Sequence, residues 1–434
     1  MPVPADKSIS HRAPDLRRAG DRSLELRGFS YGEDNVATSR AFREMGVVIE
    51  DDAHGTLRVH GVGLGGLSAP AREIDCGNSG TTMRLLSGVL AGQPFAARLT
   101  GDASLTRRPM GRIVRPLAER GARIVGTPRP GDPEGVTAPL DIGPLAEGTR
   151  LLPLEYSLPV ASAQVKSCLL LSGLWASGPT LVREPLVSRD HTERLLNALG
   201  VPVETAGPIV KLHPPRDTDA IAGFSVDLPG DLSAAAFLLV AGLLVEGSAV
   251  TTRSTGMNPT RTGLIDIVRR LGGQLGTSPR GESLGEPFGE ITARATPLRG
   301  ASLGGELALR AIDEIPIAAA LAARASGITR FFDVSELRVK ESDRIAAIVA
   351  MLRAFGVDAE EHEDGFSVEG RPGAPLAAAT VQSRGDHRIA MTAAVLALVA
   401  DGPTRIEDVD CIATSFPRFV GTLRALGAEI EVVA

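Results

Sequence analysis

Two kinds of helical segment alternate along the chain, and each kind recurs six times. The first kind is amphipathic and ends at a glycine that precedes a short strand-like run, as in FREMGVVIE and LNALGVPVE. The glycines recur at intervals of 71 to 84 residues, at Gly46, Gly121, Gly200, Gly272, Gly356 and Gly427. Glycine just after a periodic helix is typical of a helix C-terminus, because it adopts the left-handed conformation without a Cβ clash. The pattern therefore predicts six amphipathic helices that end at these positions.

The second kind of segment is apolar on almost every face and opens with a cluster of small polar or charged residues. Its copies begin near Asp6, Gly77, Ala161, Pro229, Asp313 and Gly385. A helix that is apolar all round is expected to be buried. The longest apolar run, residues 232–245, is shorter than the roughly 20 residues that a transmembrane helix needs. It therefore predicts a buried helix rather than a membrane span.

Each repeat thus holds one buried helix, one amphipathic helix and several short strands, which predicts an α/β repeat protein. The polar clusters lie where the buried helices begin. A helix N-terminus presents unpaired N–H groups and a partial positive charge, so it attracts anions. Several such ends meeting at one place, with Lys and Arg among them, would bind a polyanion. The alternative at this stage is a non-catalytic anion-binding or assembly scaffold built from the same repeats.

Composition narrows the function classes. The 434 residues suit two or three domains of about 150 residues each. The net charge of −6 and the aromatic content of 3% argue against a nucleic-acid coat or a basic membrane-surface protein. Cys76, Cys168 and Cys411 lie far apart, so we expect no disulfide framework and no metal site. The N-terminal MPVPADKS lacks the features of a targeting peptide, and we expect a cytoplasmic protein.

Seven short motifs carry the candidate chemistry. Taken singly, each is as typical of a capped or solvated helix end as of a binding site. Taken together, they place many cations, carboxylates and hydroxyls at helix starts that follow the repeat. The candidate residues are Lys7, Ser8 and Arg12 in DKSISHR; Gly80 in GNSGTTMR; Arg108 in LTRRPM; Ser162, Ala163 and Gln164 in SAQVKS with Arg189 in SRDHTE; Asp313 in DEIP; Lys340, Glu341 and Arg344 in RVKESDRI; and His387 and Arg388 in GDHRIAM.

The residue types suit binding of phosphates and carboxylates. Arginine offers a planar fork for two oxygens, lysine a compact charge, and serine a hydroxyl donor. A carboxylate such as Asp313 among many cations would stay ionised and could accept a proton or a hydroxyl hydrogen bond. The spacing of Lys340 and Arg344 predicts that they share one helix face.

The full set of motifs resembles the 5-enolpyruvylshikimate-3-phosphate synthase family of enolpyruvyl transferases. The resemblance runs in order from Asp6 to Pro417, and the spellings SAQVKS and ATSFP match the second of its two sequence types. It implies a two-domain inside-out α/β barrel of six βαβαββ repeats, three per domain. One domain would span residues 9–227, and the other would combine residues 1–8 with 228–434. The active site would lie in a cleft between them.

The resemblance also implies the reaction. The enolpyruvyl group of phosphoenolpyruvate would move to the 5-hydroxyl of shikimate 3-phosphate with release of phosphate, without metal or cofactor. Asp313, Glu341 and Lys7 would be catalytic: Asp313 at the hydroxyl proton, Glu341 at the methylene carbon, and Lys7 in contact with both substrates. Shikimate 3-phosphate would bind Lys7, Ser8, Arg12, Ser162, Ala163, Gln164, Arg189, Asp313 and Lys340. Phosphoenolpyruvate would bind Lys7, Gly80, Arg108, Gln164, Arg344 and Arg388. His387 would assist phosphate or proton handling.

Three further expectations follow from the resemblance. Gly80 leaves room beside phosphoenolpyruvate, which predicts sensitivity to glyphosate. The partners would be the two small substrates, with no nucleic acid and no membrane, and the chain would be a monomer that closes its cleft. The nearest alternative within the fold is a UDP-N-acetylglucosamine enolpyruvyl transferase. That family carries a cysteine on a mobile loop at its cleft, whereas residues 107–115 contain arginines and no cysteine.

Overall fold

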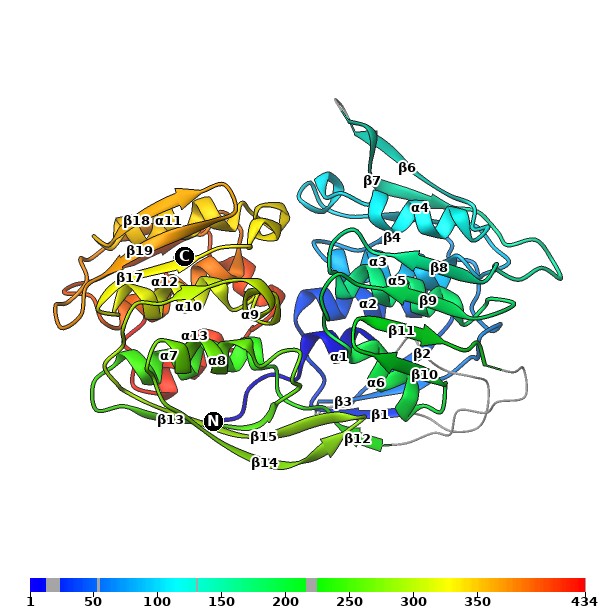
Figure 1. Cartoon of the computed structure of the whole chain (residues 1–434). Coiled ribbons are helices and arrows are strands. Elements are labelled where there is room, and N and C mark those ends of the chain that lie inside the picture. Colours follow the sequence, from blue (N-terminus) through cyan, green and yellow to red (C-terminus); the bar gives the residue numbers. More distant parts are fainter. Residues whose placement is uncertain (13–23, 53–54, 130–131, 216–224, 434) are drawn as a thin grey trace. The chain divides into compact units, whose positions relative to one another are not determined.

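The computed structural model describes residues 1–12, 24–52, 55–129, 132–215 and 225–433. The chain forms two compact units (Figure 1). Unit 1 consists of Met1–Asp6, Pro229–Glu282 and Pro287–Ala434, and unit 2 of Lys7–Leu228 and Ser283–Glu286. The structure therefore groups Lys7 with unit 2. It also groups Ser283–Glu286, the tip of a hairpin whose strands belong to unit 1, with unit 2.

Unit 2 contains three four-stranded sheets that share one strand order. In each sheet the first two strands are parallel and the other neighbours are antiparallel. The sheets are β12 (Ser225–Asp227), β1 (Leu24–Arg27), β3 (Thr56–His60), β2 (Val48–Asp51); β4 (Ile74–Asp75), β5 (Ala97–Thr100), β7 (Asp132–Ile142), β6 (Ile124–Arg129); and β8 (Leu154–Ser157), β9 (Thr180–Arg183), β11 (Ile209–Leu212), β10 (Val203–Ala206).

Helices connect these strands in the predicted βαβαββ order. They are α1 (Lys7–Arg12), α2 (Glu33–Glu44), α3 (Gly80–Leu90), η2 (Leu105–Arg107), α4 (Gly111–Glu119), α5 (Ala163–Gly173) and α6 (His191–Ala198). The first sheet departs from a simple repeat, because its parallel strand β12 comes from the far end of the unit's sequence and pairs with β1. The unit is thereby closed by its own two chain ends.

Unit 1 repeats the pattern less completely. Its full sheet is β16 (Ser302–Leu303), β17 (Gly327–Phe331), β19 (Gly365–Gly370) and β18 (Asp358–His362). The other two sheets are β13 (Ala249–Gly256), β15 (Glu286–Arg294), β14 (Leu275–Ser283), and the parallel pair β20 (Thr380–Gln382), β21 (Arg405–Glu407). The helices are α7 (Leu232–Leu244), α8 (Gly263–Arg270), α9 (Gly305–Arg310), α10 (Ile315–Ala323), η3 (Ser335–Val339), α11 (Arg344–Ala354), α12 (His387–Ala397), η4 (Asp410–Thr414) and α13 (Phe419–Ala425).

Five of the six apolar segments form the predicted buried helices, α3, α5, α7, α10 and α12, and the α/β class is confirmed. The segment near Asp6 forms the six-residue helix α1, and residues 13–23, which follow it, lie outside the described part of the chain. In unit 1, α7, α10 and α12 pack against one another, and nearly every residue of α7 and α10 is buried. In unit 2, α3 and α5 approach closely at Gly88, where a Cβ would lie 2.3 Å from the carbonyl oxygen of Cys168. The apolar helices therefore fill the cores, and polar and charged side chains gather where these helices begin.

The six helix-ending glycines are also confirmed. All of them have positive φ, between +72° and +99°, and each directly follows the C-cap residue of an amphipathic helix. A side chain in this left-handed conformation clashes with the backbone, which glycine avoids. The repeat seen in the sequence therefore marks the same backbone turn six times.

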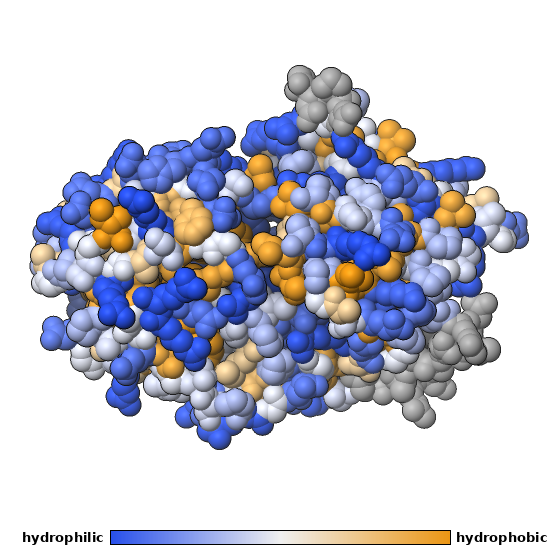
Figure 2. Space-filling view, in the orientation of Figure 1, coloured by the Kyte–Doolittle hydropathy of each residue, from blue (hydrophilic) through white to orange (hydrophobic). Residues whose placement is uncertain are grey.

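The surfaces of the two units are mostly polar. Figure 2 shows hydrophilic residues over most of the visible face, interrupted by separate apolar patches. Within the described ranges, no helix has both the length and the apolar character that a membrane crossing requires.

The glycine turns give a stability prediction. At Gly121, with φ +92°, a Cβ would meet no atom within 4 Å, so the only penalty for alanine is conformational. Gly121→Ala should lower the free energy of unfolding by about 1 kcal/mol, and Gly121→Asn by less, since asparagine tolerates this conformation. Gly421→Ala is the control, because Gly421 lies within α13 and its Cβ would also meet open space. Equal urea midpoints for Gly121→Ala and wild type would contradict the turn argument.

Candidate functional site

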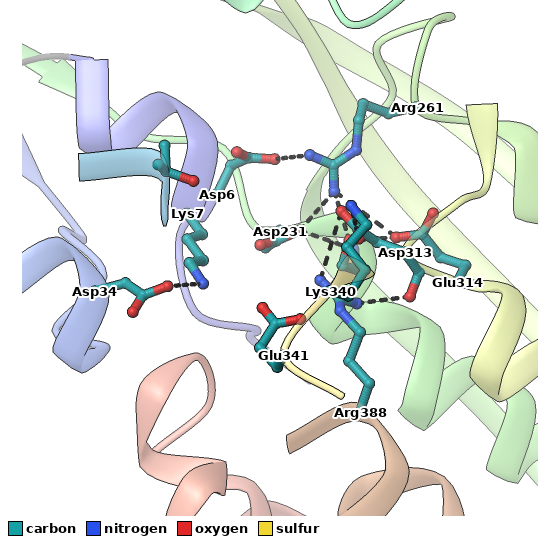
Figure 3. Close-up of polar contacts among 12 residues, drawn as sticks. Asp6, Lys7, Asp34, Asp231, Arg261, Asp313, Glu314, Lys340, Glu341 and Arg388 are labelled. Atoms are coloured by element: carbon teal, nitrogen blue, oxygen red, sulfur yellow. Dashed lines mark hydrogen bonds and ion pairs between the residues drawn. The ribbon is translucent and has the colours of Figure 1, made fainter. Parts of the chain in front are cut away.

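The carboxylate of Asp313 lies among three cations in unit 1. Its Oδ1 is 3.6 Å from Lys340 Nζ and 3.5 Å from Arg344 Nη1, and its Oδ2 is 3.8 Å from Arg388 Nη2. Arg388 Nη1 also donates to the backbone carbonyl of Asp313, at 2.8 Å (Figure 3). Asp313 precedes α10, Arg344 begins α11, and Arg388 lies in the first turn of α12. Three helix N-termini thus bring one carboxylate and two arginines together, as the sequence predicts.

Arg344 links Asp313 to two more carboxylates. Its guanidinium donates to Asp386 Oδ2 at 2.8 Å and to Glu341 Oε2 at 2.5 Å, and its side chain is only 1% exposed. Burial alone would lower the pKa of Arg344, but the carboxylates of Asp386, Glu341 and Asp313 outweigh it and raise the pKa. Burial would likewise raise the pKa of Asp386, yet Arg344 holds it below its ordinary value. Both partners therefore stay charged in the core.

The prediction that Lys340 and Arg344 share a helix face is wrong. Lys340 follows the 3-10 helix η3, and α11 begins only at Arg344, with Asp343 as its N-cap. The Asp343 side chain accepts a hydrogen bond from the backbone N–H of Ala346 at 3.1 Å, which fixes the helix start there. Lys340 reaches Asp313 from an extended segment, not from the preceding turn of a helix.

A second cluster of charged residues includes Glu314, the residue that follows Asp313. Arg261 is buried with the carboxylates of Asp6, Asp231 and Glu314 at 3.6, 3.2 and 3.8 Å, and it donates to Ser233 Oγ at 2.6 Å. Burial lowers the pKa of Arg261, but these three carboxylates raise it by more. Figure 3 shows this cluster beside Asp313. Arg261 is not predictable from its local sequence, which does not show that four segments meet there.

In unit 2, Lys7 forms an ion pair with Asp34 of α2 (Figure 3). The two side chains are 17% and 11% exposed, so the ion pair is largely buried. Asp34 is not predictable from its local sequence, because it lies in the first turn of an amphipathic helix, where acidic residues are common. Its position beside Lys7 is decided by the packing of α1 on α2.

Gly80 begins α3 beside two arginines. A Cβ on Gly80 would lie 3.0 Å from Arg84 Nη1 and 3.2 Å from Arg108 Nη1. Arg108 donates to Asn78 Oδ1 at 2.6 Å, and Arg84 donates to Gln164 Oε1. Arg84 is a further cation at this place that the candidate set left out.

The start of α5 joins the same group. Ser162 is its N-cap, with its Oγ 3.5 Å from the backbone nitrogen of Val165, and Ala163 is its first residue. Gln164 Nε2 donates to Thr81 Oγ1 at 2.9 Å. The structure therefore brings Gly80, Arg108, Ser162, Ala163 and Gln164 to two adjacent helix N-termini.

Arg12 differs from the other candidates because it is buried, with 3% exposure. Its guanidinium donates to Thr192 Oγ1 at 2.7 Å, to Ser167 Oγ at 2.8 Å and to the carbonyl of Ser8 at 2.8 Å. These bonds tie α1 to α5 and α6. Arg189, by contrast, is half-buried on the segment between β9 and α6.

His387 opens α12 and is buried, with 3% exposure. Its neighbour Asp386 caps the helix by accepting from the backbone nitrogen of Arg388 at 2.9 Å. His387 thus lies one residue from both the Arg344 ion pair and Arg388.

Each unit therefore presents helix N-termini with clustered cations, suited to anionic groups. Unit 1 adds two carboxylates, Asp313 and Glu341, that can exchange protons. Across the ranges that the structure describes, no group of three or more His, Cys, Asp or Glu could hold a metal ion.

Comparison with known proteins defines the class first. The fold matches the enolpyruvyl transferase NikO from Streptomyces tendae, with a TM-score of 0.73 and 19% identity over 99% of this chain and 95% of that one. At this identity the likeness shows the fold alone, which is that of an enolpyruvyl transferase. An EPSP synthase from Acinetobacter baumannii matches with a TM-score of 0.87 and 42% identity, over 100% of this chain and 96% of that one.

Sequence comparison then gives the family. A family model described as EPSP synthase (3-phosphoshikimate 1-carboxyvinyltransferase) matches residues 1–423. The 3-phosphoshikimate 1-carboxyvinyltransferase of Halorhodospira halophila is 49% identical over 430 residues, 99% of this chain and 94% of the relative. That of Syntrophotalea carbinolica is 48% identical over 417 residues, 96% of this chain and 94% of the relative. The chain belongs to the EPSP synthase family.

The surroundings of Lys7 predict a pH-dependent stability. His11 of α1 is buried, and its Nδ1 lies 2.7 Å from Thr38 Oγ1. Burial, together with Lys7 and Arg12, lowers the pKa of His11 well below its ordinary value of 6.5. His11 of the unfolded chain is therefore protonated below about pH 6.5, whereas His11 of the native protein stays neutral. The neutral His11 contributes to the free energy of unfolding above that pH, and this contribution is lost as the pH falls.

Thermal midpoints measured near pH 7.5 and pH 5.5 test this. Wild type should lose more stability than His11→Gln over this interval, by about 1 kcal/mol, the size of one pKa unit of linkage. Equal losses in the two proteins would show that His11 is not held neutral.

Proposed function

We propose that this chain transfers the enolpyruvyl group of phosphoenolpyruvate to the 5-hydroxyl of shikimate 3-phosphate and releases phosphate. Relatives up to 49% identical over nearly the whole chain carry the name of this carboxyvinyl transfer. The observation that supports it best is the Asp313 carboxylate held among Lys340, Arg344 and Arg388 with Glu341 on the same arginine. An anion-binding scaffold would need the cations but not both carboxylates.

The substrates bring two phosphates and two carboxylates, which require many donors and cations. In the proposed assignment, unit 2 supplies Lys7, Ser8, Arg12, Ser162, Ala163, Gln164 and Arg189 to shikimate 3-phosphate, and unit 1 supplies Asp313 and Lys340. Phosphoenolpyruvate takes Lys7, Gly80, Arg108 and Gln164 from unit 2 and Arg344 and Arg388 from unit 1. Both units therefore have to close on the same pair of substrates.

The Arg12 guanidinium forms hydrogen bonds within the protein. Its three described hydrogen bonds go to protein atoms, so in the present structure it ties α1 to α5 and α6. Its proposed contact with substrate would be made by the same guanidinium that joins these helices.

Asp313 serves as the base in the addition step. It accepts the proton of the 5-hydroxyl while that oxygen forms a bond to C2 of phosphoenolpyruvate. The neighbouring cations favour the ionised carboxylate that this role requires. Lys7, in contact with both substrates, offsets negative charge where they meet.

Glu341 serves as the acid at the methylene carbon. As the C2–oxygen bond forms, the electrons of the double bond take a proton from Glu341 and the methylene becomes a methyl group. In the second step the C2–O bond to phosphate breaks, the proton held by Asp313 passes to the leaving phosphate, and a methyl proton returns to Glu341 as the double bond re-forms. Arg344, 2.5 Å from Glu341, and His387 beside it complete the proposed proton- and phosphate-handling group.

Phosphate release from phosphoenolpyruvate tests the proposed reaction. Wild type should release phosphate from phosphoenolpyruvate only when shikimate 3-phosphate is present. Glu341→Gln should lower kcat by roughly 10²-fold or more, the usual contribution of a general acid–base group. Glu360→Gln, at an exposed position of β18 in the same unit, should leave kcat unchanged. Release with UDP-N-acetylglucosamine instead would indicate the alternative transferase, and release with neither acceptor would indicate the scaffold.

The contacts of Gly80 predict inhibitor sensitivity. The methyl group in Gly80→Ala would press on the guanidinium ends of Arg84 and Arg108 and narrow the space beside phosphoenolpyruvate. Glyphosate, which is longer than phosphoenolpyruvate, should lose roughly tenfold or more in inhibition, the usual effect of one added carbon in a filled site. The Michaelis constant for phosphoenolpyruvate should rise less.

Inhibition constants for wild type and Gly80→Ala give the measurement, with Gly421→Ala as a glycine-to-alanine control away from the arginines. Unchanged glyphosate inhibition in Gly80→Ala would refute the steric argument.

A further inference from the structure

A fully buried lysine lies between two glutamates in unit 2, outside the residues that the proposed mechanism uses. Lys166 Nζ is 2.7 Å from Glu184 Oε2 and 2.8 Å from Glu193 Oε1, and all three side chains are at most 3% exposed. The three residues come from α5, from the segment after β9, and from α6. One ammonium group thus joins three elements.

The cluster holds a particular turn of the chain. Glu184 accepts from the backbone nitrogen of Ser188 at 3.2 Å and from its hydroxyl, and Lys166 Nζ donates to the Ser188 carbonyl at 3.3 Å. Residues 184–188 therefore form a turn held by its own hydrogen bonds, and Lys166 joins this turn to α5. The next residue along the chain is Arg189.

The backbone of Lys166 is hydrogen-bonded to Ser162, one of the residues proposed to bind shikimate 3-phosphate. The backbone nitrogen of Lys166 donates to the carbonyl of Ser162 at 3.0 Å, one helical turn earlier. The neighbours of Lys166 and Glu193 in sequence, Ser167 and Thr192, lie 2.6 Å apart through their hydroxyl oxygens, and both accept from Arg12. The first turns of α5 and α6 are thus joined side by side at two points.

General stability does not account for such a cluster. Burying one ammonium and two carboxylates is expensive, and apolar side chains of similar volume often stabilise a core as well or better. Burial raises the pKa of Glu193, while the two glutamates raise that of Lys166 against the effect of burial. What the charges provide, and apolar groups would not, is a fixed geometry for the chain that leads into Arg189.

We propose that Lys166 is a positioning residue that sets where Arg189 lies relative to Ser162 and Gln164, and so shapes the site for the phosphate-bearing substrate. This inference rests on the proposed function, in which these three residues bind shikimate 3-phosphate. Lys166 itself does not touch the substrate; it acts through the turn 184–188.

The main test is the Michaelis constant for shikimate 3-phosphate in Lys166→Met, which keeps the side-chain volume and removes the charge. It should rise roughly tenfold or more, because a displaced ligand loses a charge-assisted contact. The Michaelis constant for phosphoenolpyruvate should change less than about twofold. Lys166→Arg, which keeps a charge with a different shape, should lie between wild type and Lys166→Met.

A double-mutant cycle separates positioning from general loosening of the unit. In an Arg189→Ala background, Lys166→Met should add less than about twofold to the Michaelis constant for shikimate 3-phosphate, since the ligand it positions is gone. A full tenfold addition in that background would overturn the proposal. So would an unchanged Michaelis constant in Lys166→Met itself.

Arg120→Met is the matched control. Arg120 is another fully buried cation of this unit, at 0% exposure, and it bonds to the carbonyls of Leu152 and Leu169 and the hydroxyls of Ser172 and Thr180. Its loss should lower the thermal midpoint without a selective rise in the Michaelis constant for shikimate 3-phosphate. An equal selective rise would show that any buried cation in the unit has this effect, which would also overturn the proposal.

Glu193→Gln provides the same comparison if Lys166→Met does not fold, because it keeps the shape and weakens one attraction. A smaller selective rise for shikimate 3-phosphate is expected, and none would contradict the proposal. Wild-type protein that releases no phosphate with both substrates present would instead refute the proposed function, so the two failures are distinct.

Discussion

A helix that is apolar on every face can present polar groups only at its ends, and this constraint governs the whole molecule. The buried helices α3, α5, α7, α10 and α12 fill the cores of their units. Most positions along these helices carry buried apolar side chains, so the residues able to bind a charged ligand gather where each helix begins. Unpaired N–H groups and a partial positive charge are found at the same ends. The location of the candidate site therefore follows from how the cores are packed.

Charges at these ends lie partly inside the protein and have to be balanced there. Arg344 is balanced by Asp386, Glu341 and Asp313, and Arg261 by Asp6, Asp231 and Glu314. Arg120 shows the contrasting solution, because its guanidinium donates to carbonyl and hydroxyl oxygens and burial lowers its pKa to about 10. Carboxylates thus surround the two buried arginines beside Asp313 and fix their positions. Carbonyls suffice where an arginine only joins a helix end to its neighbours.

Much of this structure could be predicted from the local sequence. The six glycines were predictable because a left-handed turn depends on the residue that adopts it. The buried helices were predictable because a helix that is buried on every face carries apolar side chains at most of its positions. The helix face shared by Lys340 and Arg344 was not, since Asp343 caps α11 and shifts its start. The spacing between these two residues does not show where a helix begins, because a capping hydrogen bond decides where the helix starts.

The sequence by itself determined the repeat, the α/β class, the ends of the helices and the motifs that place this chain in its family. These depend on residues within one or two turns of each other. Only the tertiary structure decided that β12 completes the first sheet, that Asp34 pairs with Lys7, that Arg12 is buried, and that Lys166 joins Glu184 to Glu193. Each of these contacts joins segments whose meeting depends on how whole helices and sheets pack. The local sequence around either partner is the same whether or not they meet.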